Sequence, residues 1–246
     1  MDEALLAKIG EVERDHWWFV VRRAIVLQSL EALDLPPDAR VVEVGCGTGG
    51  TLAELRARHP GWRCLGVEPS AGACQVARGR RCDVVQAALP DLPLPSAAAE
   101  CVVALDVLEH CEDDVAAASE MARVLADGGR LVATVPALPS LWSVHDVDNA
   151  HFRRYTRRTL ASALEGAGFA IERLTYFNTL LLPLGYASRW VSRLTGSRKP
   201  LGVDLPPRPV NEVLRAVFGL EAVALRHADL LVGMSLLAIA RKEPAS

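Results

Sequence analysis

The 246-residue sequence lacks a hydrophobic run long enough to cross a membrane, and we do not expect its first residues to act as an apolar leader. Its longest apolar stretch, from Leu230 to Ala240, is interrupted by Gly233 and Ser235 and falls short of the ~20 residues that a transmembrane helix needs. The first residues include the acids Asp2 and Glu3, and no apolar segment typical of a signal peptide follows them. We therefore expect a cytoplasmic protein.

Excess positive charge and paired cysteines are also absent. With 27 Lys and Arg against 30 Asp and Glu, the formal net charge is −3, so no broad cationic surface for nucleic acid is expected. The six cysteines include no C-x-x-C pair, and Cys101 lies inside an apolar run. We expect buried thiols in a reducing compartment rather than disulfides or metal ligands, and we predict no metal site.

What the sequence does contain is an alternation of strand and helix patterns, without an internal repeat. With 50% hydrophobic residues, the chain can bury one sizeable core. Apolar spacing predicts one helix over residues 2–33, which a Pro-Pro pair ends. Strands that are apolar on both faces are typical of a parallel sheet covered on both sides, so the fold class is α/β. The expected strands span residues 40–44, 63–67, 83–85, 101–105 and 130–135, and the expected helices span 51–58, 70–78 and 114–125.

A glycine-rich segment joins the first predicted strand to the next helix. Gly45 and Gly47 allow a tight turn and a close approach of the backbone to a ligand, and the helix N-terminus offers N–H groups to an anion. Adding Gly50 gives the dinucleotide pattern G-x-G-x-x-G, whereas adding Gly49 gives the pattern E/D-x-G-x-G-x-G. Glu43 favours the second pattern, because a carboxylate at this place in a dinucleotide-binding strand would be costly to bury.

A second acidic residue follows the next strand. Glu68 stands 23 positions after Gly45, where a carboxylate accepts hydrogen bonds from ribose hydroxyls in nucleotide-binding α/β folds. NAD and S-adenosylmethionine both carry such a ribose, so this position predicts a nucleoside cofactor without choosing between them. A solvated acid at a strand end is the alternative interpretation.

Together with four further segments, these motifs resemble class I S-adenosylmethionine-dependent methyltransferases that act on small molecules. The segments are residues 86–90, 103–110, 124–131 and 164–169, and the likeness covers roughly residues 40–175 in the family's order. The resemblance implies a Rossmann-like, mostly parallel seven-stranded sheet with helices on both faces and an antiparallel last strand, and S-adenosylmethionine as cofactor. It implies cofactor contacts from Glu43, Gly45, Cys46, Gly47, Gly49, Glu68, Pro69, Ala87, Ala88, Leu105 and Asp106.

One departure from the family concerns the adenine ring of the cofactor. Family members often carry an acid near position 87 that binds the adenine amino group, whereas this chain has Ala87 followed by Ala88. We therefore expect adenine recognition to depend on backbone groups and apolar contacts, with a lower affinity than is usual in the family.

The N-terminal segment carries an aromatic and basic cluster, His16 to Phe19 followed by Arg22 and Arg23. One interpretation is an amphipathic helix that packs on the domain. The other is a lid over the cofactor, with an arginine near the cofactor carboxylate. The second interpretation makes Trp18 and Arg22 candidate ligand contacts.

The connection after the fifth predicted strand, residues 136–155, concentrates titratable and aromatic side chains. It belongs to the carboxyl end of the sheet, where open α/β folds bind ligands. A neutral imidazole is the best general base for a hydroxyl acceptor, so His145, His151 and His110 are candidate catalytic residues. A structural hydrogen-bonding role is the alternative for each of them. A metal site from His145, Asp146 and His151 is a weaker interpretation, because nothing completes it. Further candidate substrate contacts are Trp142, Arg154, Tyr155 and Asn178.

We expect one methyltransferase domain over residues 1–246. Its parts are an N-terminal helical lid (1–35), a cofactor-binding core (38–178), an insertion (179–212) and a closing helix and strand (213–246). Residues 186–194 of the insertion mix apolar residues with arginines at helical spacing, and residues 196–208 predict a mobile loop. The insertion is interpreted as a core-facing lid helix, with a pocket for an apolar acceptor or a membrane-surface contact as alternatives.

The sequence thus predicts methyl transfer from S-adenosylmethionine to an oxygen or nitrogen of a small-molecule acceptor, with a carbon acceptor left open. Because the sulfonium methyl group is already activated, the enzyme chiefly aligns the acceptor and keeps water out. Two alternatives are a catalytically silent module that binds S-adenosylmethionine and an NAD-dependent oxidoreductase, which Glu43 and the segment Asp127-Gly128-Gly129 disfavour. Neither the identity of the acceptor nor the oligomeric state follows from the sequence.

Overall fold

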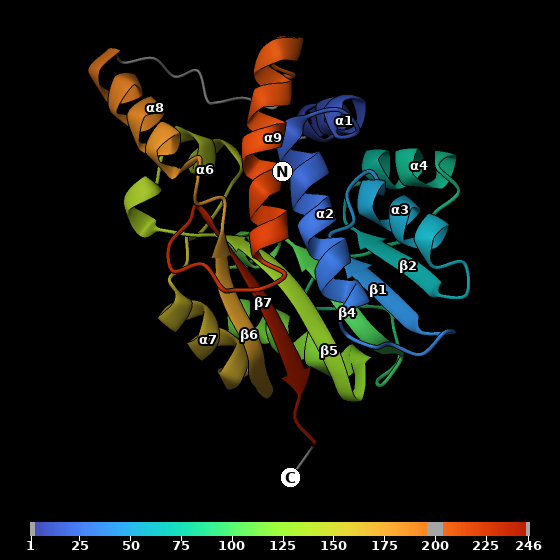
Figure 1. Ribbon diagram of the computed structural model, residues 1–246. Helices are drawn as coiled ribbons and strands as arrows, with labels where there is room; N and C mark the ends of the chain where they lie inside the picture. The colour runs from blue at the N-terminus through green and yellow to red at the C-terminus, as the bar shows by residue number, and fades with distance from the viewer. Residues whose placement is uncertain (1–2, 196–203, 245–246) are drawn as a thin grey trace.

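A seven-stranded sheet forms the centre of the protein (Figure 1). The structure, a computed structural model, describes residues 3–195 and 204–244. The helices are α1 (Glu3–Val12), α2 (Trp17–Glu31), α3 (Gly50–Arg58), α4 (Ala71–Gly79), α5 (Asp114–Val124), α6 (Val144–Asp148), α7 (Arg157–Gly166), α8 (Leu182–Thr195) and α9 (Arg208–Ala224), with short 3-10 helices η1 (Leu108–His110) and η2 (Pro139–Leu141). The strands are β1 (Arg40–Val44), β2 (Arg63–Glu68), β3 (Asp83–Gln86), β4 (Ala99–Leu105), β5 (Leu125–Pro136), β6 (Phe169–Phe177) and β7 (Ser235–Lys242).

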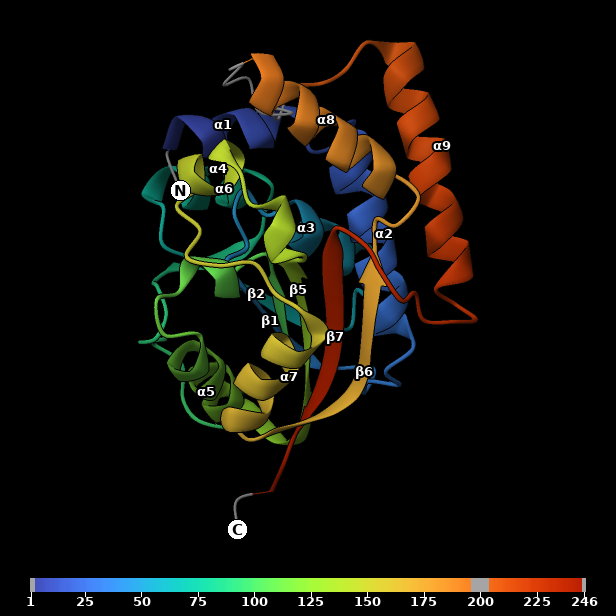
Figure 2. The ribbon, with the colours of Figure 1, turned by 90° about the vertical axis from the view of Figure 1, so that its left-hand side faces the viewer.

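The strands are ordered β3-β2-β1-β4-β5-β7-β6 across the sheet. β1 pairs in parallel with β2 and β4, and the parallel pairing continues outward to β3 and β5. The last strand, β7, lies antiparallel between β5 and β6, and Figure 2 shows its arrow opposed to that of β6. The predicted Rossmann-like sheet with an antiparallel last strand is therefore confirmed.

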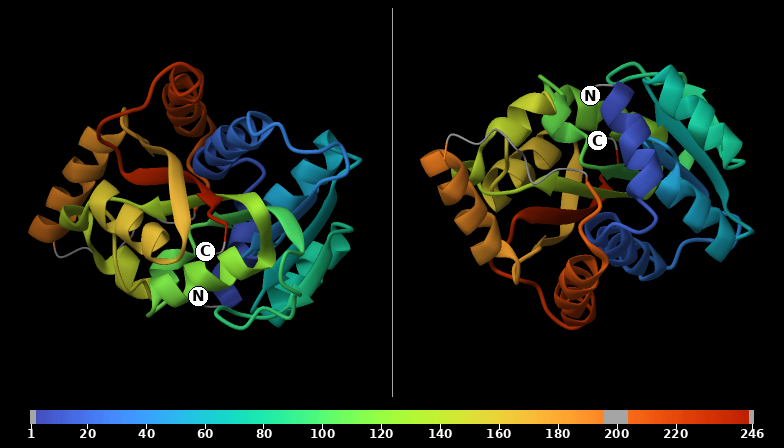
Figure 3. Two further views of the ribbon diagram at one scale, coloured as in Figure 1. Left: turned by 90° about the horizontal axis from the view of Figure 1, so that it is seen from below. Right: turned by 90° about the horizontal axis from the view of Figure 1, so that it is seen from above.

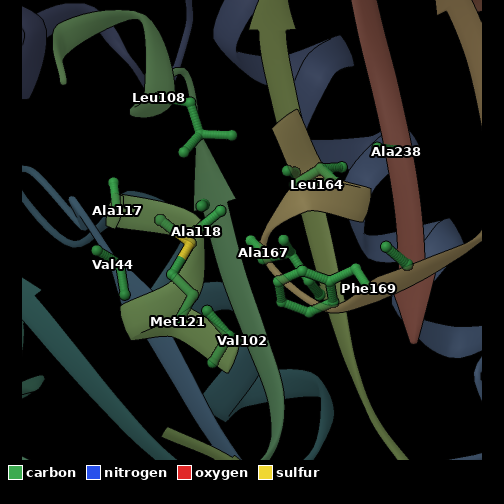
Figure 4. Packing of buried hydrophobic residues seen from close by; sticks show 14 of the residues in the cluster. Val44, Val102, Leu108, Ala117, Ala118, Met121, Leu164, Ala167, Phe169 and Ala238 are labelled. Atoms are coloured by element: carbon green, nitrogen blue, oxygen red, sulfur yellow. The ribbon is translucent and has the colours of Figure 1, made fainter. Parts of the chain in front are cut away.

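Helices cover both faces of the sheet, as the views in Figure 3 show. On one face, Met121 of α5 and Leu164 of α7 join strand residues such as Val102 in a buried cluster (Figure 4). On the other face, α2, α3, α4 and α9 contribute to a second cluster that includes Leu52 and Phe218. Because both faces are covered, the central strands are apolar on both sides, as the sequence predicts.

The predicted helix over residues 2–33 is in fact two helices. α1 ends at Val12, and α2 begins at Trp17 after a turn. The ring of His16 caps α2 by accepting a hydrogen bond from the Trp18 backbone N–H at 3.2 Å. The break is hard to read from the sequence, because helix N-caps are most often Ser, Thr, Asp or Asn rather than His.

Helices α1, α6 and α8 lie beyond the carboxyl ends of the parallel strands (Figures 1 and 2). α9 packs along α2, and Asn211 joins them by accepting a bond from the Trp17 N–H at 3.0 Å and donating to the Asp15 carbonyl at 2.8 Å. Residues 196–203, most of the predicted mobile loop, lie outside the described residues. Across residues 3–195 and 204–244, no helix combines the length and the apolar character that a membrane span requires.

Candidate active site

A cleft of about 1530 Å³ lies at the carboxyl ends of β1, β2 and β4. From β1, the chain places successive strands first on one side of the sheet (β2, β3) and then on the other (β4, β5). Open α/β folds form a ligand crevice at such a switch point. All the predicted catalytic, cofactor-binding and substrate-binding residues line this cleft, except Gly49 and Tyr155. One side, here called the cofactor side, is lined by Glu43, Gly45, Cys46, Gly47, Glu68, Pro69, Ala87, Ala88, Leu105 and Asp106. The opposite side, the acceptor side, is lined by Trp18, Arg22, His110, Trp142, His145, His151, Arg154 and Asn178.

The glycine-rich loop after β1 is held in place by the end of β2. The Gly45 and Cys46 N–H groups donate to the Val67 carbonyl at 2.8 and 3.1 Å. Gly45 and Gly47 have φ of +68° and +52°, a region that L side chains rarely adopt. A Cβ on Gly45 would lie 2.6 Å from the Val107 side chain, whereas one on Gly47 would meet nothing within 4 Å. The backbone at Gly47 is therefore open to a ligand.

Glu68 joins this loop to the helix that follows β2. One carboxylate oxygen accepts the Gly47 N–H at 2.9 Å, and the other accepts the Ser70 N–H at 2.9 Å. The side chain is only 5% exposed, yet it lines the cleft. Each carboxylate oxygen can accept more than one hydrogen bond. Glu68 can therefore also accept hydrogen bonds from ligand hydroxyl groups in the cleft, as its predicted role requires.

Glu43 is a buried carboxylate with one oxygen that lacks a hydrogen-bond partner among the described residues. It is 3% exposed at the end of β1, and its Oε2 atom finds no hydrogen-bond partner among the described residues. Burial raises the pKa of Glu43 to about 8, against the lowering effect of Arg22. A cationic group placed in the cleft beside Glu43 would supply the missing partner, which fits the ammonium group of S-adenosylmethionine.

Asp106 follows β4 and connects the two sides of the cleft. Its carboxylate accepts the Thr134 hydroxyl at 3.1 Å and pairs with Arg22 of α2. The backbone at Asp106 has φ of +56°, a conformation that costs energy in a non-glycine residue and is often found at functional sites. The sequence interpretation placed Arg22 near a ligand carboxylate; the structure places it in the cleft with Asp106 as its ion-pair partner.

Gly49 differs from the other predicted cofactor contacts because it does not line the cleft. It caps α3 with φ of +79°, and a Cβ there would lie 3.0 Å from the Ala77 side chain. The glycine is thus required by the backbone conformation and by the packing of α3 on α4, rather than by contact with a ligand.

The acceptor side is organised around Asp146, which lies in α6 and is fully buried. Its carboxylate accepts bonds from the Ser143 N–H at 2.9 Å, the Arg154 Nε at 2.7 Å and the His151 ring at 3.1 Å. Burial alone would raise the pKa of Asp146, but the bond from His151 and the charge of Arg154 outweigh it and hold the pKa well below its usual range. Arg154 also donates to the Ala137 carbonyl at 3.0 Å. Asp146 therefore fixes two of the predicted contact residues.

The three candidate catalytic histidines meet in the cleft. The ring centroid of His151 lies 4.6 Å from that of His110 and 6.5 Å from that of His145. Burial and the neighbouring His151 lower the pKa of His110 to about 4, so this imidazole is neutral at physiological pH. Residues 110 and 151 come from different loops, and the sheet brings them together because both loops follow neighbouring strands, β4 and β5.

Tyr155 does not reach the cleft, contrary to the expectation that it contacts the acceptor. Its side chain is 1% exposed, and its hydroxyl donates to Asp114 of α5 at 2.7 Å. Its backbone pairs with the strand end, because the Tyr155 N–H donates to the Pro136 carbonyl at 2.9 Å. The residue anchors the connection after β5 to the protein core.

The remaining predicted contacts on the acceptor side differ in how far they are buried. Trp18 stacks on Phe177 and Phe218, with ring centroids 6.0 and 5.4 Å apart, so it also belongs to the core. Trp142 is 37% exposed at the cleft. Asn178 is buried, and its Oδ1 atom lacks a hydrogen-bond partner within the described part of the chain.

Among the buried cleft residues that sequence reasoning missed is the carboxylate Glu109. It follows Asp106 in η1, it is 0% exposed, and neither carboxylate oxygen makes a hydrogen bond to a described residue. Burial, and then the charge of Asp106, raise the pKa of Glu109 well above its ordinary value. The signals in the sequence were its place shortly after a buried strand and within the segment 103–110 of the family resemblance.

Comparison with known proteins gives the family. A family model described as a methyltransferase domain matches residues 20–174, which include the glycine loop, Glu68 and the connection after β5. The chain belongs to the class I S-adenosylmethionine-dependent methyltransferases. The cofactor predicted from the motifs is thus the cofactor of the family, and the orphaned oxygen of Glu43 is consistent with it.

Individual relatives of the methyltransferase differ in what they act on. A protein of Mycolicibacterium smegmatis named as a probable S-adenosylmethionine-dependent methyltransferase is 32% identical over 169 residues, covering 67% of this chain and 63% of its own. A malonyl-acyl-carrier-protein O-methyltransferase of Methylococcus capsulatus is 31% identical over 179 residues, covering 68% and 63%. The solved geranyl diphosphate C-methyltransferase of Streptomyces coelicolor has a TM-score of 0.63 at 20% identity, over 98% of this chain and 85% of that one, a likeness of fold. The chain spans 46% to 63% of the length of the first curated relatives it matches.

Proposed function

We propose that this protein transfers the methyl group of S-adenosylmethionine to an oxygen or nitrogen atom of a small-molecule acceptor. One observation carries the proposal: a single cleft joins the Glu43 carboxylate, whose Oε2 atom has no partner among the described residues, and the open glycine loop to three histidines. A cofactor bound on one side of this cleft would therefore have candidate proton acceptors on the other. The two sides together suit a transfer reaction between two ligands.

The residues of the cofactor side have distinct tasks in this proposal. S-adenosylmethionine supplies a methyl group on a sulfonium, which needs no further activation. Glu68 accepts the ribose hydroxyls, and Glu43 accepts the ammonium group, which satisfies its Oε2 atom. The backbone at Gly47 approaches the ligand closely because no Cβ stands in the way. Ala87 and Ala88 line the adenine end and offer backbone and apolar contacts.

The lining of the acceptor side favours an acceptor with an apolar body. Trp142 and Leu184 are exposed at the cleft, and Leu181, Val210 and Met234 also line it. Ligand pockets usually have volumes of ~300–1,000 Å³, so a cleft of about 1530 Å³ has room for a cofactor and an acceptor together. The formal net charge of −3 favours a small acceptor over nucleic acid.

Proton transfer distinguishes a hydroxyl acceptor from an amine acceptor. A hydroxyl must lose its proton as its oxygen is methylated, so the imidazoles of His110, His145 and His151 are proposed as proton acceptors. A neutral amine attacks without prior deprotonation and depends on them less. We also propose a cytoplasmic location, because the six cysteines are unpaired and suit a reducing compartment.

The test is a transfer assay with methyl-labelled S-adenosylmethionine and a panel of alcohols, phenols, amines and carbon acids with apolar bodies. We expect label in an O- or N-methyl product, and a loss of about 100-fold in O-methylation for His145→Ala. Binding of S-adenosylmethionine without turnover of any acceptor would favour a silent binding module. Label found only on carbon, or binding of NADH in place of S-adenosylmethionine, would overturn the proposal.

A further inference from the structure

Three potential metal ligands converge on the acceptor side of the cleft. Glu109 and His110 lie in η1 after β4, and His151 lies in the connection after β5. One ligand atom from each residue lies within 4.8 Å of the other two, and all three residues line the cleft. Small side-chain rotations would bring three atoms at this spacing around one ion, because metal–nitrogen and metal–oxygen bonds are ~2.0–2.2 Å long.

The state of Glu109 provides an independent indication that a cation belongs here. The side chain is fully buried, and both of its carboxylate oxygens lack hydrogen-bond partners among the described residues. A carboxylate buried without a partner is strongly unfavourable unless it is paired or coordinates a metal. The two guanidinium groups that face Glu109 electrostatically, those of Arg22 and Arg154, are paired with Asp106 and Asp146 instead.

The residues around the cluster have the arrangement that supports a metal-bound histidine. Asp146 already accepts the Arg154 guanidinium, so it is ionised and the His151 Nδ1 must donate to it at 3.1 Å. The other ring nitrogen of His151, Nε2, then carries a lone pair. A carboxylate that orients a ligand histidine in this way is a recurrent feature of metal sites. On His110, a hydrogen bond to the Ala150 backbone orients the ring in the same manner.

We propose that Glu109, His110 and His151 bind one divalent transition-metal ion, with Asp146 as the positioning residue for His151. Two imidazoles and one carboxylate suit Zn²⁺, Fe²⁺ or Mn²⁺ rather than Ca²⁺ or Mg²⁺, which prefer oxygen ligands. Three protein ligands leave positions open toward the cleft. This ligand set differs from the group His145, Asp146 and His151 that the sequence suggested, because the fold places Asp146 behind His151.

The role of the ion rests on the proposed methyl transfer. An ion at this place would bind the acceptor oxygen and lower the pKa of its hydroxyl, which favours methylation on oxygen. The imidazoles of His110 and His151 would then serve as ligands, and His145 is left as the candidate proton acceptor. The binding of the ion itself, however, needs neither the cofactor nor the acceptor, so it can be tested separately.

The experiment titrates the full chain, stripped with a chelator, with Mn²⁺ and with Zn²⁺ by calorimetry, with Co²⁺ absorption as a report on the ligand set. We expect one ion per chain, and binding at least ~100-fold weaker in Glu109→Gln and in His151→Ala. Asp146→Asn should weaken binding by ~10–100-fold, the usual effect of losing such a support. His145→Ala, in the same cleft, is the matched control and should bind the ion as the unchanged chain does.

Folding of each variant is checked by thermal unfolding and by titration with S-adenosylmethionine. Stoichiometric binding that is lost in folded Glu109→Gln and His151→Ala supports the site. If the unchanged chain binds no ion, or if both folded variants bind it as well as the unchanged chain, the site is wrong. The ion titration does not depend on methyl transfer. A failed transfer assay would therefore count against the proposed function without affecting the proposed metal site.

Discussion

The two sides of the cleft are built in different ways. The cofactor side comes from one stretch of chain, residues 43–106, in which neighbouring parallel strands end beside one another. The acceptor side combines α2, η1, the connection after β5 and parts of α8 and α9, which are distant in the sequence. Backbone conformation shapes the first side, whereas contacts between side chains of separate segments shape the second. Short motifs therefore describe the first side well and the second poorly.

The buried acids of the two sides show the same contrast. Glu68 accepts hydrogen bonds from the backbone N–H groups of Gly47 and Ser70. These donors belong to the main chain and do not depend on side-chain identity. Asp146 depends mainly on the side chains of His151 and Arg154. A substitution on the cofactor side should therefore act mainly on cofactor affinity, whereas loss of Asp146 should also disturb the connection after β5 that carries His151 and Arg154.

The largest expected effect is that of Glu68→Ala on cofactor binding. The substitution removes the acceptor of the Gly47 and Ser70 N–H groups and the proposed partner of the ribose. We expect calorimetry to show affinity for S-adenosylmethionine reduced about 100-fold, equivalent to ~2.7 kcal/mol. Glu100→Ala is the matched control, because Glu100 pairs with Arg40 outside the cleft. Equal losses in the two variants would contradict the assigned role of Glu68.

Next in size is the effect of Trp18→Ala on stability. The ring stacks on Phe177 and Phe218 and joins α2 to the core, so we expect about 2 kcal/mol of lost unfolding free energy in denaturant titration. Trp62→Ala, which removes a ring stacked on His59 outside the cleft, should cost less. Affinity for S-adenosylmethionine should change less than ~3-fold in both variants. A large loss of affinity with unchanged stability would place Trp18 on the ligand instead.

Particular residues show how far the sequence could predict this molecule. Glu43, Gly45 and Glu68 were identified because their roles depend on spacing along one stretch, and the antiparallel last strand followed from the family resemblance. Glu109 was missed because its burial depends on loops that follow two different strands. Tyr155 was assigned to the acceptor because a tyrosine beside Arg154 looks like a ligand contact, while its actual partner belongs to a helix earlier in the chain.

The pH dependence of the cofactor side centres on Glu43. The pKa of Glu43 is about 8 in the folded chain, above the ordinary 4.5. Between these values the folded chain holds a proton that the unfolded chain releases, so this residue lowers stability as pH rises from about 5 to 8. In the absence of cofactor, Glu43→Gln should therefore gain in Tm relative to the unchanged chain across this range. If the difference in Tm between Glu43→Gln and the unchanged chain does not vary with pH, the raised pKa of Glu43 is contradicted.

The same residue links cofactor binding to proton release. If the ammonium group of S-adenosylmethionine pairs with Glu43, binding favours the ionised carboxylate and releases up to about one proton at pH 7. Calorimetry in buffers of different ionisation enthalpy measures this release. Glu43→Gln should abolish it and weaken binding about 10-fold, a smaller loss than that of Glu68→Ala. Undiminished proton release in the variant would assign the ammonium group to another partner.

The smallest expected effect comes from Tyr155→Phe, which tests whether Tyr155 belongs to the core or to the acceptor side. The substitution keeps the ring and removes only the hydroxyl that donates to Asp114. Because Asp114 keeps its ion pair with Arg153, we expect a loss of about 1 kcal/mol in the free energy of unfolding. Cofactor affinity and KM for the acceptor should stay unchanged, since Tyr155 lies outside the cleft. A raised KM at unchanged stability would instead return this residue to the acceptor site and would require the connection after β5 to rearrange when the acceptor binds.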